Sequence, residues 1–440
     1  MSSTTTERSA ENGVHGLARR VLKGSSYSIM QSTTDHHEEA RATSSGNGVQ
    51  AGPSRAFDVD DAVERIAQAL QATAIERDAD GGVPKRERDL LRQSGLLSLV
   101  VPTELGGLGQ DWSTTLRAVR RIAEVDGSMA HVFGFQHLLL ATLRLFGDSG
   151  QYAPLLRRTV ERAHFWGNAL NPLDTRTSIE PRGGDFIVNG KKSFCSGAGD
   201  SDMLVLSATN ARGALVVAAI PTRRDGVVIV GDWDNMGQRQ TDSGTVEFHG
   251  VPIEKGEILS SPGPLGTPFA SLRPLIAQLT LANVYLGIAR GALDEAKRFT
   301  RSRGKPWFAA RVESALRDPY VLHHYGEFFV ELEAARLLAD HAASELDAAW
   351  KRGESLLAEQ RGACAVVVAT AKVKAARAGL DVVHRVFEVT GARATARSEG
   401  LDRFWRNLRT HSLHDPVDYK LCELGEWVLR EELPTPTFYS

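Results

Sequence analysis

Two histidines near the end of the sequence have the residue type and spacing that proton transfer requires. His411 and His414 are three positions apart. Residues at this spacing share one face of a helix, so we expect both imidazoles to face one cavity. Pro416 disfavours helical geometry at Asp415, which predicts that one helix stops near His414 and a second begins beyond it. At a helix C-terminus the carbonyl dipole favours a protonated imidazole, and such a ring exchanges protons near neutral pH.

Asp415 is the carboxylate at the same break in the backbone. Its place directly before Pro416 predicts that it is the N-cap of the second helix, with the proline as the first helical residue. A carboxylate that accepts backbone N–H groups has a lowered pKa and is a weak base. We therefore expect His414 and His411, rather than Asp415, to transfer protons. An isolated histidine pair can also merely cap a helix or pack, so the rest of the sequence must decide.

The composition limits the classes of protein to which the sequence can belong. The 440 residues have a net charge of −2 with acidic and basic residues intermixed, which argues against a surface for nucleic acid or anionic membranes. The three cysteines lie far apart, at neither metal-ligand nor disulfide spacing, and indicate a reducing compartment. No apolar run approaches the roughly 20 residues of a membrane span, and a secretory signal is not evident. We therefore expect a soluble, cytoplasmic protein.

The spacing of apolar residues divides the sequence into four regions. Residues 1–55 are rich in Ser, Thr, Gly and charge, which predicts a disordered N-terminal extension. Residues 56–162 have helical periodicity and predict an α-helical domain. Residues 163–264 contain short β-rich runs between Gly, Asn and Asp, and predict a small antiparallel barrel or sandwich. Residues 265–440 contain long apolar stripes and predict a four-helix bundle. The expected fold class is α+β and mostly α.

The individual elements follow from the same patterns. The N-terminal helices are expected near 57–80, 85–93, 113–125 and 128–146. The strands are expected to begin at Asp185, Met203, Ala214, Gly226 and Thr245. The bundle helices are expected near 271–303, 318–352, 357–390 and 417–431. Their surplus apolar surface suggests subunit packing.

This order of domains resembles the acyl-CoA dehydrogenase superfamily. The run Leu96–Gly109 is similar to the N-terminal signature of that superfamily, and Gly190–Ala198 is similar to its flavin-contacting strand. The sequence more narrowly resembles the flavin-dependent monooxygenase branch typified by dibenzothiophene monooxygenase. The runs that carry this resemblance are Phe194–Ala198, Gln240–Gly244, Ala277–Ala289, Tyr325–Phe328 and Arg403–Pro416. The resemblance covers residues 57–440 and implies a homotetramer.

The resemblance implies an FMNH2-dependent two-component monooxygenase. In this branch reduced flavin and O2 form a C4a-hydroperoxyflavin, which must be shielded from water before it oxygenates the substrate. The sequence lacks a nicotinamide fingerprint in the required context, so a separate NAD(P)H-dependent flavin reductase is expected to supply FMNH2. The expected substrate is small and apolar. It is an organosulfur compound such as a thioether or sulfoxide, or an electron-rich heteroaromatic such as indole.

The resemblance also implies residues that hold the flavin ring. Ser196 matches the position whose hydroxyl lies against flavin N5, and Phe194 and Trp233 match aromatic residues of the pocket wall. Asn168 matches an amide beside the flavin, and Ser243 matches a further cofactor contact. On pattern alone, Phe-Cys-Ser in a strand is ordinary alternating core.

The substrate side of the same pocket is implied in the same way. His131 matches a histidine that lines the pocket, and Phe135 stands where dibenzothiophene monooxygenase has tyrosine. The missing hydroxyl implies a difference in oxygen chemistry or in substrate choice. Phe194 and Trp233 are expected to complete the substrate pocket, with His414 and His411 as acid–base groups.

Two basic residues are expected to hold the flavin phosphate, and a third is expected to bind the cofactor. Arg393 lies where FAD-dependent dehydrogenases have a glycine-rich turn from a neighbouring subunit, and a guanidinium suits a terminal phosphate. Lys305 stands where the branch has arginine, so the charge is kept and bidentate geometry is lost. Arg303 matches a cofactor-binding arginine of the dehydrogenases, which leaves FAD open as an alternative to FMN. Each of the three is otherwise an ordinary solvated surface residue.

Two other functions remain open at this point. Asp415 is in register with the catalytic glutamate of the dehydrogenases, so an acyl-CoA dehydrogenase or nitroalkane oxidase that uses FAD and this carboxylate as its base is one alternative. Tightly bound FAD and turnover without a reductase would reveal it. The other alternative is an oligomeric scaffold that has lost flavin binding, which would show no affinity for FMNH2.

Overall fold

The computed structural model describes residues 57–440, so the disorder predicted for residues 1–55 lies outside the described residues. The first described domain is helical, as the sequence predicts. Its helices are α2 (Val59–Gln71), α3 (Ala74–Asp80), α4 (Lys85–Gln93), α5 (Trp112–Ala123), α6 (Gly127–Phe146) and α7 (Ser149–Arg162). The helix expected near 57–80 is thus two helices, and α7 was not predicted individually. Side chains of four aspartates accept first-turn N–H groups as N-caps, namely Asp58, Asp111, Asp126 and Asp148.

Two helices of the fold contain long apolar windows. α6 and α8 (Leu272–Arg303) are long and apolar enough to cross a membrane by length and composition. Their apolar windows are 94% and 100% buried inside the fold, so both are core helices. The prediction that no apolar run approaches the length of a membrane span is therefore wrong for these two segments. The condition that it overlooked is the burial of a whole helix inside a large domain.

The middle domain is a seven-stranded sheet. Its strands are β1 (Trp166–Ala169), β2 (Thr177–Arg182), β3 (Asp185–Lys192), β4 (Met203–Thr209), β5 (Leu215–Pro221), β6 (Val227–Ile229) and β7 (Val246–Ile253). The order is β1-β4-β2-β3-β7-β6, and β5 pairs with β4. The antiparallel prediction holds for four pairings and is wrong for two, since β1 and β2 pair with β4 in parallel. β1 and β2 themselves were not predicted, because β1 is only four residues long and buried throughout, without alternation.

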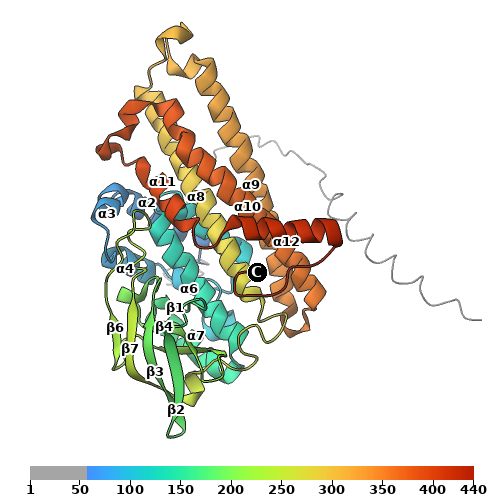
Figure 1. Cartoon of the computed structure of the whole chain (residues 1–440). Coiled ribbons are helices and arrows are strands. Elements are labelled where there is room, and N and C mark those ends of the chain that lie inside the picture. Colours follow the sequence, from blue (N-terminus) through green and yellow to red (C-terminus); the bar gives the residue numbers. More distant parts are fainter. Residues whose placement is uncertain (1–56) are drawn as a thin grey trace, which may run out of the picture. The chain divides into compact units, whose positions relative to one another are not determined.

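The C-terminal domain contains the predicted bundle. Its long helices α8, α9 (Pro319–Arg352) and α10 (Ala358–Thr390) lie side by side in Figure 1, and α12 (Val417–Arg430) crosses α10. The bounds agree with the prediction to within one residue at each end. The short helix α11 (Asp402–His411) precedes α12. It ends at His411, three residues earlier than predicted, because residues 412–414 form a turn.

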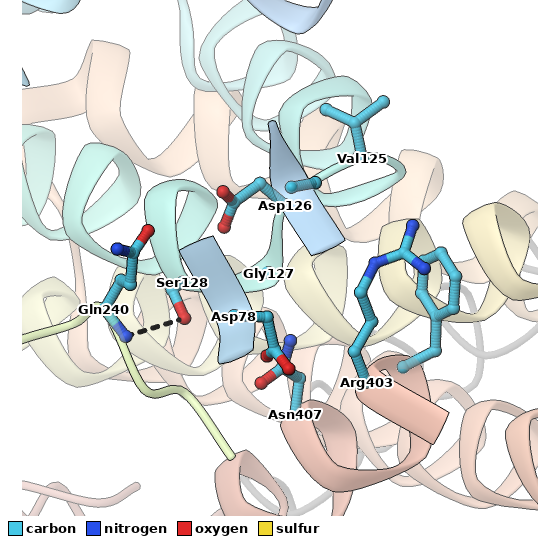
Figure 2. Close-up of a pocket in the computed structure, with 10 residues that line it drawn as sticks. Asp78, Val125, Asp126, Gly127, Ser128, Gln240, Arg403 and Asn407 are labelled. Carbon is cyan, nitrogen blue, oxygen red and sulfur yellow. Dashed lines mark hydrogen bonds between the residues drawn. The ribbon is translucent and has the colours of Figure 1, made fainter. Parts of the chain in front are cut away.

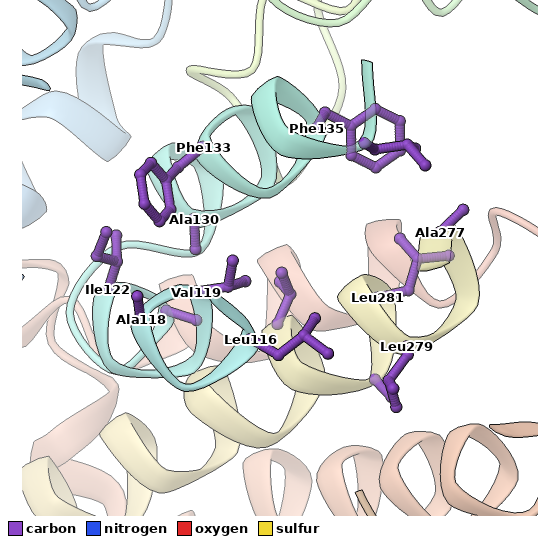
Figure 3. Close-up of a cluster of buried hydrophobic side chains, with 14 of the residues drawn as sticks. Leu116, Ala118, Val119, Ile122, Ala130, Phe133, Phe135, Ala277, Leu279 and Leu281 are labelled. Atoms are coloured by element: carbon purple, nitrogen blue, oxygen red, sulfur yellow. The ribbon is translucent and has the colours of Figure 1, made fainter. Parts of the chain in front are cut away.

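Helices α5, α6 and α8 form the apolar core that fixes the position of the site. Figure 3 shows Leu116 and Val119 of α5 facing α6 and α8 in this cluster. Two glycines of α8 permit the close approach, because a Cβ at Gly287 or Gly291 would clash with backbone oxygens of α5. The core therefore holds α6 and α8 in a fixed relation to each other.

Candidate active site

Two imidazoles and a hydroxyl from three parts of the fold meet in one buried series. His411 at the end of α11 has its Nε2 atom 2.8 Å from Nδ1 of His131 on α6. Nε2 of His131 lies 2.8 Å from Oγ of Ser196, in the loop after β3. All three residues are buried. Tyr285 of α8 donates its hydroxyl to the backbone oxygen of His411 at 3.1 Å, which fixes the end of α11.

The series continues through two more hydroxyls. Oγ of Ser196 lies 2.8 Å from Oγ of Ser243, which lies 2.7 Å from Oγ1 of Thr241. Thr241 donates to the backbone oxygen of Gln238 at 2.9 Å. A carbonyl oxygen only accepts, so the hydroxyl proton of Thr241 is committed to it. Thr241 must then accept from Ser243, and Ser243 from Ser196.

The same reasoning assigns the imidazole protons. A neutral imidazole donates at one nitrogen and accepts at the other. Since Ser196 donates to Ser243, it accepts from Nε2 of His131, and Nδ1 of His131 accepts from Nε2 of His411. Nδ1 of His411 is then a bare acceptor, and it is buried without a hydrogen-bond partner among the described residues. We call His411, His131, Ser196, Ser243 and Thr241 the relay, whose open end is His411 Nδ1.

Burial keeps both imidazoles of the relay neutral. It lowers the pKa of His131 to about 3, and the nearby His414 adds to this effect. Burial also lowers the pKa of His411 well below its usual value, with further contributions from His131 and His414. The sequence predicted a protonated ring at this helix end. At His411 desolvation outweighs the helix dipole, so that expectation is wrong for this residue.

His414 does not lie in the relay. Its Nδ1 atom lies 3.0 Å from Oδ1 of Asp415, and its side chain is 34% exposed. Its ring lies beside that of Tyr439 in the C-terminal segment, with 6.0 Å between centroids. The two histidines that the sequence placed on one face therefore diverge. His411 points to a buried series, and His414 points from a partly exposed position to the buried carboxylate of Asp415.

Asp415 is not the N-cap that the sequence predicted. Helix α12 begins at Val417 with Pro416 at the cap and no side-chain cap bond. The carboxylate turns inward and pairs with Lys372 of α10, and Oδ2 accepts from Nε2 of Gln278 of α8 at 3.2 Å. Burial alone would raise the pKa of Asp415, but the bond from His414 and the charge of Lys372 lower it below its usual range. The carboxylate is a weak base for this reason, and not because of a cap.

Lys372 was missed by the sequence reasoning, although a signal for it exists. It lies on the buried face of α10 between Val368 and Ala376, at helical spacing. Lys374, two residues on, is partly exposed and pairs with Glu331. A lysine that interrupts an apolar stripe therefore marks a buried partner.

Two aromatic residues form an open wall near Ser196. Phe194 has a φ of 58°, which is uncommon for a bulky residue, and is 59% exposed. Its ring meets that of Trp233 edge-on with 6.1 Å between centroids. Trp233 donates Nε1 to the backbone oxygen of Gln238 at 2.8 Å, the same oxygen on which the relay ends. The wall and the relay are thus joined at one atom.

Asn168 and Phe135 complete the predicted pocket residues. Asn168 lies on β1, where its backbone N–H donates to the oxygen of Ser196 at 2.9 Å and its Oδ1 accepts from Leu170. Its NH2 group has no partner among residues 57–440. Phe135 packs on His131 with 4.1 Å between centroids. An exposed aromatic wall, a hydroxyl and an unpaired amide suit a flat heteroaromatic ring with polar edges, so these residues fit a flavin.

A small polar pocket lies beside the relay, and Asn407 of α11 is among the residues that line it. Figure 2 shows Asp78, Asp126, Gln240 and Asn407 around it, in a cavity of about 10 Å³. Oδ1 of Asn407, one turn before the end of α11, accepts the backbone N–H of Gln238 at 2.6 Å. Helix α11 therefore holds both ends of the relay.

The three basic residues predicted to bind the cofactor lie together, but far from the relay. Arg393 donates to the backbone oxygen of Arg303 at 2.7 Å, and Lys305 is exposed two residues further on. Arg303 itself pairs with Glu399 at 2.5 Å. Arg303 follows Tyr285 by 18 residues on α8, which corresponds to about 27 Å of helix rise. This cluster therefore cannot share one FMN molecule with the relay of the same chain.

Three family models match the chain in succession. They are the N-terminal, middle and C-terminal domains of acyl-CoA dehydrogenase, over residues 57–162, 164–251 and 279–419. The chain is 56% identical over 377 residues to a probable FMNH2-dependent monooxygenase, SfnC of Pseudomonas putida, with 85% of this chain and 95% of the relative covered.

Solved structures match over nearly the same range. Methanesulfinate monooxygenase MsuC from Pseudomonas fluorescens is 56% identical with a TM-score of 0.86, covering 86% of this chain and 99% of that chain. Dibenzothiophene monooxygenase TdsC from Paenibacillus sp. A11-2, in complex with FMN and indole, is 42% identical with a TM-score of 0.84. That match covers 87% of this chain and 100% of the other.

Proposed function

Because this chain belongs to the acyl-CoA dehydrogenase family, we propose that it is an FMNH2-dependent monooxygenase that oxygenates a small sulfur compound. The single observation that carries this proposal is the buried relay from His411 through His131 to Ser196. Relatives that are 56% and 42% identical are monooxygenases, and one of them has a structure with FMN. A dehydrogenase of this fold would need a free carboxylate as base. Here Asp415 is held by Lys372.

The flavin would be held by residues of the middle domain. Phe194 and Trp233 supply the aromatic wall, and Ser196 and Asn168 supply hydrogen-bonding groups. Reduced FMN supplies the electrons that activate O2 when it is bound. The surroundings of His131 are buried and exclude water. A dry site limits the loss of activated oxygen in side reactions before it reaches the substrate.

The residues of this chain move and hold protons at defined atoms. His131 donates from Nε2 to Oγ of Ser196 and accepts at Nδ1 the proton of His411. A proton that enters at Nδ1 of His411 would displace the Nε2 proton of His411 to His131 and the Nε2 proton of His131 to Ser196, which would release its surplus proton to an acceptor bound against its Oγ. His414, which is partly exposed, is the residue through which we infer that protons arrive from solvent.

We infer that a second copy of the chain completes the phosphate site. The cluster of Arg303, Lys305 and Arg393 lies about 27 Å along α8 from the relay. Beside it, Trp307 and Phe308 are 69% and 82% exposed, an apolar surface that a partner would cover. This arrangement supports a homo-oligomer, and a homotetramer is our proposal. A cytoplasmic location is also proposed, since the three cysteines are unpaired.

The substrate is proposed from the relatives and from the pocket. MsuC is named for methanesulfinate and TdsC for dibenzothiophene, and indole is bound in a structure of TdsC. For this chain we propose an organosulfur compound, with an electron-rich heteroaromatic such as indole as the second candidate. Phe135 makes the wall beside His131 apolar. A separate NAD(P)H-dependent flavin reductase is proposed as the source of FMNH2.

One experiment separates the candidate functions. The purified protein is mixed anaerobically with FMNH2, then with 18O2 and a panel of sulfinates, thioethers, dibenzothiophene and indole. The expected result is a product with one 18O atom that requires both the protein and FMNH2. Tightly bound FAD with turnover in the absence of any reductase would show a dehydrogenase or oxidase instead. Absence of any FMNH2 binding would support a scaffold.

A further inference from the structure

Lys372 of α10 is a buried cation that the proposed reaction leaves without a role. We propose that Lys372 is a positioning residue that withholds Asp415 from acting as a base and, through that carboxylate, orients His414 for proton transfer. This inference rests on the proposed function and deepens it. In this view the ion pair of Lys372 is what prevents the loop of Asp415 from supplying the base that a dehydrogenase needs.

The ion pair is placed where charges are expensive to keep. The side chain of Lys372 is 1% exposed and that of Asp415 is 8% exposed. Taking both charges out of water costs free energy that their attraction offsets only with good geometry and further hydrogen bonds. An apolar pair of similar size would often be as stable. A functional reason for retaining the pair is therefore needed.

The carboxylate of Asp415 is held by donors from three sides. Oδ1 accepts from Lys372 of α10 and from Nδ1 of His414, and Oδ2 accepts from Gln278 of α8. A base must present a free lone pair and a matched pKa to the substrate. Asp415 presents neither, because its charged form is stabilised in place. Asp415, which stands at the position of the dehydrogenase base, is thereby fixed in a structural ion pair.

The orientation of His414 follows from the same contacts. While Asp415 is ionised it only accepts, so Nδ1 of His414 carries the proton. Nε2 is left as the nitrogen that receives and releases a proton. A carboxylate fixes the tautomer of an imidazole in the same manner in serine hydrolases. Lys372 acts through Asp415, because its ammonium group contacts that carboxylate.

Other titratable groups surround the pair of Lys372 and Asp415 and contribute to its pH dependence. Tyr285 of α8, His411 of α11 and Tyr439 of the C-terminal segment face Asp415. Lys420 and Glu423 of α12 face Lys372 and bond to each other. Burial lowers the pKa of Lys372 to about 8 while the charge of Asp415 opposes this shift, so the lysine is protonated at neutral pH.

The test compares three variants of the full-length protein. Lys372→Met removes the cation, Lys372→Met with Asp415→Asn removes both charges, and Lys374→Met is the matched control on the same helix. In Lys372→Met we expect the yield of 18O-labelled product per FMNH2 oxidised to fall about 10-fold or more. The double variant should regain thermal stability and still show low yield. Lys374→Met should match the unsubstituted protein.

A second readout needs no flavin. Loss of Lys372 removes a charge that lowers the pKa of Asp415, so near pH ~4, the usual pKa of the carboxyl, the folded state of Lys372→Met binds more protons than that of the unsubstituted protein. Its unfolding midpoint relative to that of the unsubstituted protein should therefore fall as the pH rises from 4 to 6.5. A double variant with normal product yield, or a pH-independent difference in midpoint, would overturn the proposal. If the unsubstituted protein makes no labelled product, the proposed function fails, and the midpoint experiment still tests Lys372.

Discussion

The Nε2 atom of His411 lies 2.8 Å from the Nδ1 atom of His131, and burial keeps both rings neutral. The contact joins residues 280 positions apart, one on the N-terminal domain and one on α11. Neither ring can be replaced without leaving a buried polar atom unpaired. Substitution of either histidine is therefore a direct test of the relay.

His131→Phe is expected to remove the proton path to Ser196 while preserving the volume of the pocket. Because a positioned acid–base group contributes about 100-fold or more, the yield of oxygenated product should fall by about that factor. The measurement is labelled product per FMNH2 oxidised. His137→Phe is the control, since His137 lies on the same helix, is fully buried and makes no hydrogen bond to the relay. Equal losses in both variants would argue for a packing effect.

His137 itself is expected to be a stability defect. Both of its ring nitrogens are buried without a hydrogen-bond partner among the described residues. An unsatisfied buried polar group costs about 1–3 kcal/mol, so His137→Leu should raise the free energy of unfolding by about 1 kcal/mol. Urea unfolding at pH 7 measures it. A destabilised His137→Leu variant would mean that a bound water satisfies the ring.

The buried histidines also predict the pH dependence of stability. Burial lowers the pKa of His131 and of His137 to about 3, below the unfolded value of about 6.5. Between these values the unfolded state binds more protons, so the free energy of unfolding falls as the pH falls. Each histidine should contribute about 1.4 kcal/mol per pH unit in that window. Unfolding midpoints at pH 6.5 and 5 should differ less in His137→Leu than in the unsubstituted protein.

His414→Ala is expected to leave the fold intact and strip oxygenation. The side chain is 34% exposed, so the change in unfolding free energy should stay within about 1 kcal/mol. Loss of its imidazole removes the proposed entry point for protons. Product yield is compared with that of Leu413→Ala, an exposed neighbour. An unchanged yield would remove His414 from the reaction.

The basic cluster at the far end of α8 predicts the affinity for FMN. Arg393→Ala and Lys305→Ala should each raise the dissociation constant for FMN by roughly 10-fold, since a charge-assisted hydrogen bond contributes about 1.5–3 kcal/mol. Fluorescence quenching of FMN measures this. Arg397→Ala, an exposed arginine in the same segment, is the control. Riboflavin, which lacks the phosphate, should bind all three variants equally.

The sequence predicted local structure well and long-range contacts poorly. The bounds of α8, α9 and α10 are correct to within one residue, because long apolar stripes define long helices. Asp415 was assigned to a cap from its neighbours alone, while its actual partner, Lys372, lies 43 positions away. No local pattern encodes which distant residue reaches a side chain. The strand β1 was missed because it is only four residues long and buried throughout, without alternation.

The resemblance named Ser196 and His131, the spacing of two histidines named His411, and the structure joins all three through hydrogen bonds. It did not name Thr241 or Gln238, which fix the direction of the protons. That direction depends on one backbone carbonyl, and a backbone oxygen has no signature in sequence. The residues of the site were thus partly predictable from the sequence, and the direction of hydrogen-bond donation along the relay was not.

Asn407 and His411 sit one turn apart on α11: His411 is the open end of the relay, and Asn407 bonds to Gln238, whose backbone oxygen accepts from Thr241 at the other end. Both contacts come from one helix of 10 residues. A slide or tilt of α11 would therefore break the contact between His411 and His131 and the contact between Asn407 and Gln238 at the same time.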